Sequence, residues 1–310
     1  MRAARELDYF IVDVFTSSAL AGNPLAVVMN TCGLTTGRMQ AIAREFNLSE
    51  TTFIERGALA DEHRDGVRMR IFTTQEELNF AGHPTLGTAS VLKLAAPECA
   101  VDSVVKLKLN AGTVPVYFNG QCPGGEALDG EMTQRDPEFG ADLAPSDVAW
   151  LCGLAAADFH PDLPPQVVST GTAFAIVVLR SLDALSRLKV DHDAATPWLR
   201  HRGARWFYVL APNPNQDQGP TQWQGRQWRA RMQFYGGEDP ATGSAAGCAI
   251  GYLVARGVVA SGQTILITQG VEIGRPSHIR LSARTLDARV TDVRVGGGTV
   301  LVANGKLFLP

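Results

Sequence analysis

The fold of this chain is decided by residues 76 to 92, Glu-Glu-Leu-Asn-Phe-Ala-Gly-His-Pro-Thr-Leu-Gly-Thr-Ala-Ser-Val-Leu. A strand-like run over 68–73 leads into this stretch, which then turns at Gly82. Pro84 suits the first position of a helix, because the N–H that proline lacks has no helical partner there. We therefore predict His83 as the N-cap. No charged residue follows until after Leu92, and a helix that is apolar on all sides belongs inside a core.

The same arrangement recurs in the second half of the chain. Residues 229–234 resemble a strand, 236–238 a turn, and Asp239-Pro240 a second N-cap and first helical residue. An uncharged run over 241–255 then ends before Gly257, a usual residue just past a helix end. Two buried helices of small residues, each opened by a polar residue and proline, predict two related halves.

Length and charge limit the protein's class and partners. The 310 residues predict about two domains of ~150 residues each. A content of 45% hydrophobic and 19% charged residues is ordinary for a soluble globular protein. The net charge of -3 argues against a nucleic-acid or anionic-membrane partner, since neither would be attracted by a basic surface.

Cysteine usage and hydropathy indicate the compartment. The five cysteines and six histidines lack Cys-x-x-Cys and His-x-x-x-His spacing, so we expect neither a disulfide framework nor a metal site. Reduced thiols suit a cytoplasmic protein. The polar start over 1–6 shows no signal peptide, and the longest clean apolar run, 173–179, is too short to span a bilayer. We therefore predict a cytoplasmic protein without a membrane span.

The remaining segments predict strands around one buried helix in each half. Thr35 or Thr36 caps a helix that ends at Asn47, and a strand over 50–55 follows. We predict a loop over 57–66 and a turn at 296–298 before the last strand. Residues 119–130 are the best linker candidate, so the domain boundary is placed near 128. The predicted class is α+β, with domains over 1–128 and 129–296 and no βαβ alternation long enough for a doubly wound sheet.

Four polar residues are candidates for chemistry, and each has a plain structural alternative. His83 and Asp239 are ordinary helix caps, yet a helix start also lowers imidazole basicity and suits a proton donor or acceptor. Ser244 is common in such a helix, and no Gly-x-Ser-x-Gly nucleophile elbow is present. Glu50 is either a solvated rim carboxylate or a partly desolvated general base.

Both predicted helix starts suit an anion. Free N–H groups and the helix dipole bind a carboxylate without Arg or Lys. If the two halves face each other, both starts point into one interdomain cleft that holds a small carboxylic acid. No Gly-x-Gly-x-x-Gly follows a strand and no phosphate-binding loop occurs, so dinucleotide and nucleotide binding are not indicated.

Several motifs, in order along nearly the whole chain, resemble the PhzF-like (phenazine biosynthesis) proteins of the diaminopimelate epimerase fold superfamily. They are Gly22-Asn23-Pro24, Leu48-Ser49-Glu50-Thr51-Thr52-Phe53, Glu77-Leu78-Asn79-Phe80-Ala81-Gly82-His83-Pro84-Thr85, Ser169-Thr170-Gly171, Glu238-Asp239-Pro240-Ala241-Thr242-Gly243-Ser244-Ala245 and Gly274-Arg275-Pro276-Ser277.

The resemblance implies two pseudo-symmetric domains, each a curled, mostly antiparallel sheet (an open barrel) around a central helix. A last strand over 297–310 would complete the first domain. It also implies a homodimer and proton transfer without a cofactor or metal. The family's catalytic acid/base falls on Glu50, with His83 and Asp239 in support. We expect substrate contacts from Ser49, Gly82, Thr85, Thr170, Gly171, Gly243 and Ser244.

The resemblance predicts an isomerase that moves a proton on trans-2,3-dihydro-3-hydroxyanthranilate or a similar ring acid. Related two-thiol epimerases carry a Cys in each helix-start motif, whereas this chain has Ala81 and Asp239-Pro240 there. A one-carboxylate isomerase is therefore favoured. An amino-acid epimerase and a non-catalytic binding protein of the same fold are the alternatives.

Overall fold

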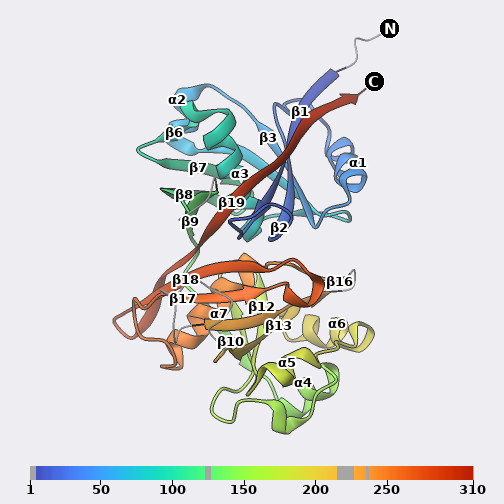
Figure 1. The fold of residues 1–310 in the computed structure, drawn as a ribbon, viewed down its shortest axis with the longest axis vertical. Helices are drawn as coiled ribbons and strands as arrows, with labels where there is room; N and C mark the ends of the chain where they lie inside the picture. Colours follow the sequence, from blue (N-terminus) through green and yellow to red (C-terminus); the bar gives the residue numbers. More distant parts are fainter. Residues whose placement is uncertain (1–4, 123–126, 215–226, 235–236, 310) are drawn as a thin grey trace. The chain divides into compact units, whose positions relative to one another are not determined.

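The computed structural model describes residues 5–122, 127–214, 227–234 and 237–309. The chain forms two compact units, shown in Figure 1: unit 1 is Met1–Thr133 with Gly296–Pro310, and unit 2 is Gln134–Val295. The first segment of unit 1 ends with strand β9 (Leu128–Thr133). Residue 128, near which we placed the domain boundary, is the first residue of that strand. Residues 123–126 of the expected linker lie outside the described residues.

The strands of unit 1 form a sheet that curls back on itself. Pairing runs in the order β19, β1, β2, β3, β4, β7, β8, β9, and β9 also pairs with β19. The pairs β2–β3 and β4–β7 are parallel, and β19–β1, β1–β2, β3–β4, β7–β8 and β8–β9 are antiparallel. The strands are β1 (Arg5–Val14), β2 (Asn23–Val28), β3 (Glu50–Glu55), β4 (Val67–Phe72), β5 (Glu77–Leu78), β6 (Ala100–Val101), β7 (Val104–Leu109), β8 (Gly112–Gln121) and β19 (Arg289–Leu309).

Unit 2 repeats the order of pairings found in unit 1. From β10 to β18 the neighbours are antiparallel except for β12–β13 and β14–β17, which hold the places of β2–β3 and β4–β7. This repetition confirms the predicted α+β class. The strands are β10 (Glu138–Asp142), β11 (Gln166–Ser169), β12 (Ala173–Val178), β13 (Trp206–Pro212), β14 (Gln227–Arg231), β15 (Gln233–Phe234), β16 (Gly237–Glu238), β17 (Ile265–Gln269) and β18 (Ser277–Leu286).

One buried helix lies against the sheet of each unit, as predicted. Helix α3 (Gly82–Ala95) packs on β1, β2 and β7, and helix α7 (Gly243–Ala255) packs on β11, β12 and β18. All residues of α3 from Gly82 to Leu92 are buried. At Gly87 a Cβ would lie 2.7 Å from the side chain of Leu25, so the small residue permits close packing.

The other helices confirm one prediction and correct another. Helix α1 (Thr36–Phe46) begins at the Thr35 cap and ends at left-handed Asn47, as predicted. Residues 57–66 were wrongly predicted as a loop, since Leu59–Asp65 form helix α2. The buried Glu62 carboxylate accepts from Gly57 N and Arg56 Nε, which anchors the helix. The others are α4 (Pro145–Leu151), α5 (Leu182–Ser186), α6 (His192–His201) and the 3-10 turns Pro97–Cys99, Ala156–Asp158 and Val271–Ile273.

Both predicted N-caps were wrong. The N-cap of α3 is Ala81, which makes His83 the second helical residue, and the N-cap of α7 is Thr242. Pro84 is the third residue of α3, which proline tolerates because the first-turn N–H groups have no helical acceptor. Pro240 precedes α7 and belongs to the turn that leads into it.

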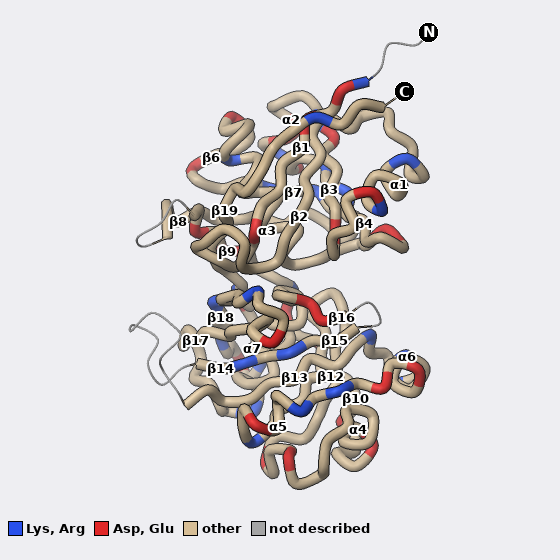
Figure 2. Tube along the Cα trace, turned by 45° about the vertical axis from the view of Figure 1, so that its right-hand side comes forward, with Lys and Arg blue, Asp and Glu red and all other residues tan. Residues whose placement is uncertain are grey.

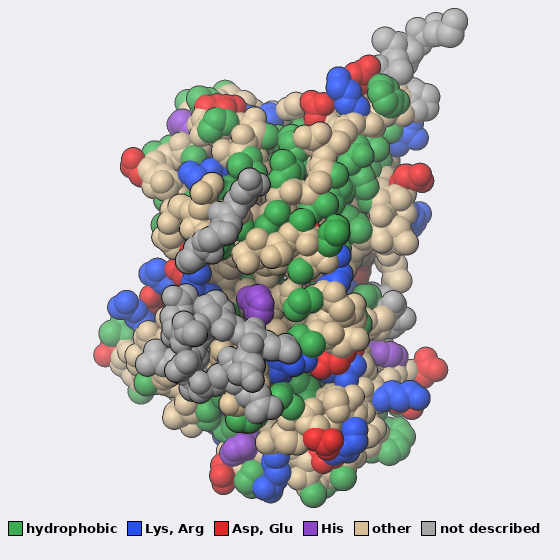
Figure 3. Space-filling view, viewed as in Figure 1, with side chains coloured by type: hydrophobic (Ala, Val, Ile, Leu, Met, Phe, Trp, Pro, Cys, Tyr) green, Lys and Arg blue, Asp and Glu red, His purple; other side chains and the backbone are tan. Residues whose placement is uncertain are grey.

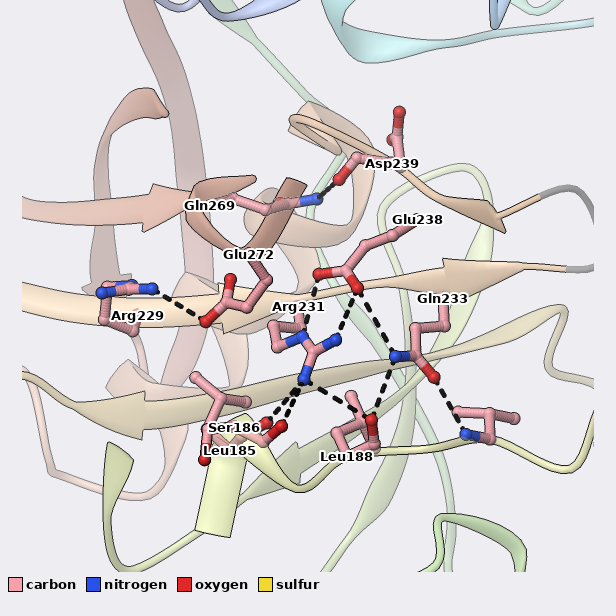
Figure 4. A network of polar contacts seen from close by, with 11 residues as sticks. Leu185, Ser186, Leu188, Arg229, Arg231, Gln233, Glu238, Asp239, Gln269 and Glu272 are labelled. Atoms are coloured by element: carbon pink, nitrogen blue, oxygen red, sulfur yellow. Dashed lines mark hydrogen bonds and ion pairs between the residues drawn. The ribbon is translucent and has the colours of Figure 1, made fainter. Parts of the chain in front are cut away.

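A bidentate Arg–Glu ion pair precedes each central helix. Arg70 donates to Glu77 over 2.8 and 2.6 Å, and Arg231 donates to Glu238 over 2.9 and 2.6 Å (Figure 4). Both pairs join residues seven positions apart. The spacing from Glu77 to the first residue of α3 equals the spacing from Glu238 to the first residue of α7. His83 of unit 1 therefore matches Ser244 of unit 2, rather than Asp239 as the proline motifs indicated.

The glycines at 296–298 do not form the predicted turn. They lie within β19, which continues without a break from Arg289 to Leu309. A Cβ on Gly298 would overlap the carbonyl oxygen of Thr16, whose N–H donates to the Gly298 oxygen over 3.2 Å. Gly298 therefore lets two backbones approach closely.

The surface carries mixed charge and one apolar strip. Lys, Arg, Asp and Glu are interspersed along both units in Figure 2. Hydrophobic side chains gather along β19 in the space-filling view of Figure 3, and Leu301 and Phe308 of that strand are exposed. None of the helices described here is long and apolar enough to cross a membrane.

Candidate active site

Two predicted catalytic groups lie close together in unit 1, between β3 and α3. Glu50 is the first residue of β3 and His83 the second of α3, and their Oε2 and Nε2 atoms are 3.4 Å apart. The side chains are only 17% and 5% exposed, respectively. Thr52 and Thr88 join the same strand and helix by a 2.8 Å hydroxyl–hydroxyl hydrogen bond. The buried packing of α3 therefore places an imidazole beside a mostly desolvated carboxylate.

Asn23 determines the protonation of the His83 ring. Its Nδ2 lies 3.2 Å from Nδ1 of His83, and an amide nitrogen can only donate, so Nδ1 accepts. The neutral ring then carries its proton on Nε2, the atom that faces Glu50. Burial lowers the pKa of His83 to about 3. Burial is the cause of this shift, so the ring is neutral at physiological pH, with Nε2 3.4 Å from the Glu50 carboxylate.

The other unit 1 residues with predicted substrate contacts have different surroundings. Ser49 is half-buried and directly precedes β3. Gly82 is buried at the first position of α3. The Thr85 hydroxyl donates to the Ala81 carbonyl over 2.7 Å and is fully buried, so it supports the helix start.

In unit 2 the predicted residue Asp239 is tied to the start of α7. Its Oδ2 accepts a 2.6 Å hydrogen bond from the hydroxyl of Thr242, the N-cap of the helix. Its backbone oxygen accepts from Nε2 of Gln269 over 2.8 Å. Figure 4 shows the Asp239 side chain pointing away from Gln269. The carboxylate is thus held by a hydroxyl donor at a helix start, where negative charge is stabilised.

The remaining predicted residues of unit 2 surround the same helix start. The Thr170 hydroxyl donates to Oε1 of Gln134 over 2.7 Å, and Nε2 of Gln134 donates to the Gly243 carbonyl. Ser244 is the second residue of α7 and is buried. Gly171 is exposed and has a φ of 133°, a conformation that favours glycine. Thr170 therefore supports α7 through its hydroxyl, and Gly171 shapes the turn beside it.

The cysteines do not supply a reactive thiolate near the helix starts. Cys248 lies in α7, fully buried, and burial raises the pKa of its thiol to about 11. Its thiol lies 3.5 Å from both the Thr170 hydroxyl and the Thr172 carbonyl. A neutral, enclosed thiol is a poor base, because the thiolate is the reactive form. Within the described ranges no cluster of three or more His, Cys, Asp or Glu could hold a metal ion.

Three residues of this site were not recognised from the sequence. Asn23 and Thr242 occur only within longer motifs of the resemblance, and Gln269 occurs in none of them. The position of the two amides at strand ends could have indicated a role. Asn23 is the polar first residue of the apolar strand β2, and Gln269 is the polar last residue of β17. Both side chains are fully buried, and buried amides need partners.

Comparison with known proteins gives the family. Residues 12–305 match the model of the PhzC-PhzF family, described as phenazine biosynthesis-like protein. The chain is 38% identical to a trans-2,3-dihydro-3-hydroxyanthranilate isomerase of Pseudomonas aeruginosa, over 97% of this chain and 99% of that protein. A solved structure of a predicted epimerase from the same species has 33% identity and a TM-score of 0.80, with 97% and 99% coverage. A PhzF-family structure from Bacillus anthracis has 23% identity and a TM-score of 0.83, with 98% and 99% coverage. The chain therefore belongs to the PhzC-PhzF family of phenazine biosynthesis-like proteins.

Proposed function

We propose that this protein is a cofactor-independent isomerase that moves a proton on a small carboxylate, trans-2,3-dihydro-3-hydroxyanthranilate or a similar ring acid. The observation that carries the proposal is the buried Glu50–His83 pair, with Oε2 and Nε2 3.4 Å apart. The name of the 38% identical relative supports the substrate class.

Glu50 is the general acid/base in this mechanism. Its carboxylate takes a proton from a ring carbon, the electron pair shifts through the adjacent double bonds, and the same proton returns to another carbon. This step breaks one C–H bond and forms another, and its product is an enol. The enol then loses its O–H proton and gains a solvent-exchangeable proton on carbon to become the ketone, so no redox partner is needed. A positioned acid/base contributes roughly 10²–10⁴-fold to the rate. Neutral His83 lies with Nε2 3.4 Å from Glu50 Oε2 and limits the positions that the carboxylate can take.

The start of α7 supplies the second set of groups. In the proposal Asp239 hydrogen-bonds the reacting system, and Ser49 and Ser244 hold its polar substituents. The N–H groups at the start of each buried helix, around Gly82 in unit 1 and around Gly243 in unit 2, suit the substrate carboxylate. Thr85, Thr170 and Gly171 shape these helix starts. Support comes from the backbone positions of these residues, at or beside the first turn of each buried helix.

We also propose that the protein works as a homodimer in the cytoplasm. All five cysteines are free thiols, as in a reducing compartment. The exposed Leu301 and Phe308 of β19 offer an apolar surface of the kind that subunits bury. Sedimentation velocity tests the dimer, and a monomer at micromolar concentration contradicts it.

Isomerisation is tested by incubating the protein with dihydro-hydroxyanthranilate and related ring acids in D₂O. The expected result is a change in ultraviolet absorbance together with deuterium in the product by mass spectrometry. An amino-acid epimerase would instead exchange Cα hydrogen with loss of optical rotation. A binding protein would bind a ring acid without any exchange. Either of these outcomes contradicts the proposal.

A further inference from the structure

A fully buried amide, that of Gln269 at the end of β17, joins three residues around the start of α7. Its Oε1 accepts from the Tyr208 hydroxyl over 3.0 Å and from Thr242 N over 3.1 Å. Its Nε2 donates to the Asp239 carbonyl over 2.8 Å and to the Thr242 hydroxyl oxygen over 2.9 Å. The amide therefore uses both lone pairs and both N–H groups within the protein.

The orientation of this amide is determined by its backbone partners. A peptide N–H can only donate, so Oε1 has to face Thr242 N. A peptide carbonyl can only accept, so Nε2 has to face the Asp239 oxygen. With the amide placed in this way, the Tyr208 hydroxyl has to donate its proton to Oε1. Burial and the negative charge of Asp239 raise the pKa of Tyr208, so this donor stays protonated.

The placed amide in turn determines where the Thr242 hydroxyl proton points. Nε2 of Gln269 already donates to the hydroxyl oxygen, so the single hydroxyl proton is left for another acceptor. The Asp239 Oδ2 atom lies 2.6 Å away, a distance typical of a hydroxyl–carboxylate hydrogen bond. Tyr208, Gln269 and Thr242 thus form one chain of donors that ends on the Asp239 carboxylate.

We propose that Gln269 is a positioning residue that acts through Thr242 to hold the Asp239 carboxylate in its working orientation. This inference rests on the role of Asp239 in the proposed isomerisation. A second buried glutamine, Gln134, donates to Gly243 at the same helix start but bonds Thr170 rather than Thr242 or Asp239. Of these two glutamines, Gln269 is the one that contacts both Thr242 and Asp239.

The test compares T242V with T242S in the isomerase assay, using D239N as the reference for complete loss of the carboxylate. Valine keeps the shape of threonine without the hydroxyl, whereas serine keeps the hydroxyl. We expect T242V to lower kcat about 10- to 100-fold with KM changed about threefold at most, because one charge-assisted hydrogen bond is lost. We expect T242S to stay within about threefold of the wild type in both constants. Equal kcat for T242V and the wild type, beside an inactive D239N, overturns the inference but not the proposed function.

The Q269E variant tests whether the amide acts through the hydroxyl. A glutamate accepts at both oxygens, so the Thr242 proton is drawn away from Asp239. We expect Q269E to lower kcat about tenfold or more alone, but about threefold at most in the T242V background, because the two changes break one chain. Fully additive effects contradict the inference.

Crystal structures of T242V and T242S decide the positioning role without an activity assay. We expect the Asp239 carboxylate to leave its position in T242V and to keep it in T242S. An unmoved carboxylate in T242V overturns the inference even if Q269E is inactive. If the wild type turns over no ring acid, the proposed function fails, and these structures still decide whether Gln269 and Thr242 position Asp239.

Discussion

His83 presents its Nε2 proton to the Glu50 carboxylate across 3.4 Å, because the Asn23 amide occupies the other ring nitrogen. The two groups come from different elements, the end of a strand and the first turn of a helix. Their side chains are 17% and 5% exposed, so little water reaches them. In these surroundings the Glu50 carboxylate lies beside a neutral ring rather than a charged one.

Replacing Glu50 with Gln removes the proposed acid/base and preserves its shape. We expect E50Q to lose about 10²-fold or more in kcat while its melting temperature and substrate affinity stay close to the wild type. Steady-state kinetics and calorimetry measure this. Glu55, at the other end of the same strand, is the matched control, and E55Q should keep kcat within about threefold. Near-normal turnover by E50Q would refute the mechanism.

The lowered pKa of His83 predicts a pH-dependent stability difference between the wild type and H83N. In the unfolded chain His83 titrates near its ordinary value of 6.5, whereas burial keeps the folded ring neutral to about 3. Between these values the unfolded state binds one more proton, so acid favours unfolding. We expect the wild type to lose up to about 1.4 kcal/mol of unfolding free energy per pH unit more than H83N as the pH falls below 6.5.

Urea unfolding from pH 7 to pH 4 measures this difference. Because asparagine does not titrate, subtracting the H83N curve removes the contributions of the other histidines, of which His192 and His278 also have lowered pKa values. Parallel curves, or a wild type that gains stability on acidification relative to H83N, would show that Glu50 controls the ring charge instead.

The two Arg–Glu pairs predict unequal costs for the same substitution. Arg231 and Glu238 are 9% and 7% exposed, whereas Arg70 and Glu77 are 15% and 23% exposed. Removing one partner leaves the other charge unpaired, and water reaches the unit 1 pair more easily. We expect E238A to destabilise unit 2 by about 3–5 kcal/mol and E77A to destabilise unit 1 by less.

Guanidinium unfolding of both variants, with the transitions assigned to each unit, checks the comparison. Arg231 also donates to the Leu185 and Ser186 carbonyls, so E238A should weaken the attachment of α5 as well. Equal losses in the two variants would mean that burial does not set the strength of these pairs.

Gly298 and Gly37 predict opposite effects of alanine. A Cβ at Gly298 meets the Thr16 backbone, which cannot rotate away, so G298A should cost about 1–3 kcal/mol. Gly37 lies exposed in α1 with nothing within 4 Å of a new Cβ, so G37A should gain about 0.5–1 kcal/mol. Thermal unfolding measures both. A G298A variant as stable as the wild type would show that β19 can shift away from Thr16.

The sequence predicts best where one local pattern decides the structure. The uncharged run after Pro84 identifies a buried helix, and Thr35 and Asn47 identify both ends of α1. Proline locates a helix start less well. It fits any position whose backbone N–H has no helical acceptor, and several positions near a helix start meet this condition. The caps assigned to His83 and Asp239 were wrong for this reason.

Features that depend on distant segments could not be predicted in the same way. Helix α2 is anchored by the contacts of Glu62 with Arg56 and Gly57, which a polar composition does not reveal. A run of glycines in the sequence is compatible with a turn and also with the close approach of two backbones. Gly298 permits the close approach of β19 to the backbone of Thr16. Motif resemblance identified Glu50 and His83 as a group, but their contact depends on how β3 and α3 pack.

Strand β19 has a consequence for the order in which the chain can mature on the ribosome. Its pairing with β1 joins Arg5 to Leu309 and continues through Ile11 and Ala303. Strand β1 therefore cannot complete its hydrogen bonding until β19 has been synthesised. Unit 2 is contiguous and has all of its residues by Val295. The half of the protein that is translated second can therefore finish folding first. Until β19 has been synthesised and paired, the edges of β1 and β9 that receive it are open to other chains, and this is the period when a chaperone would matter most.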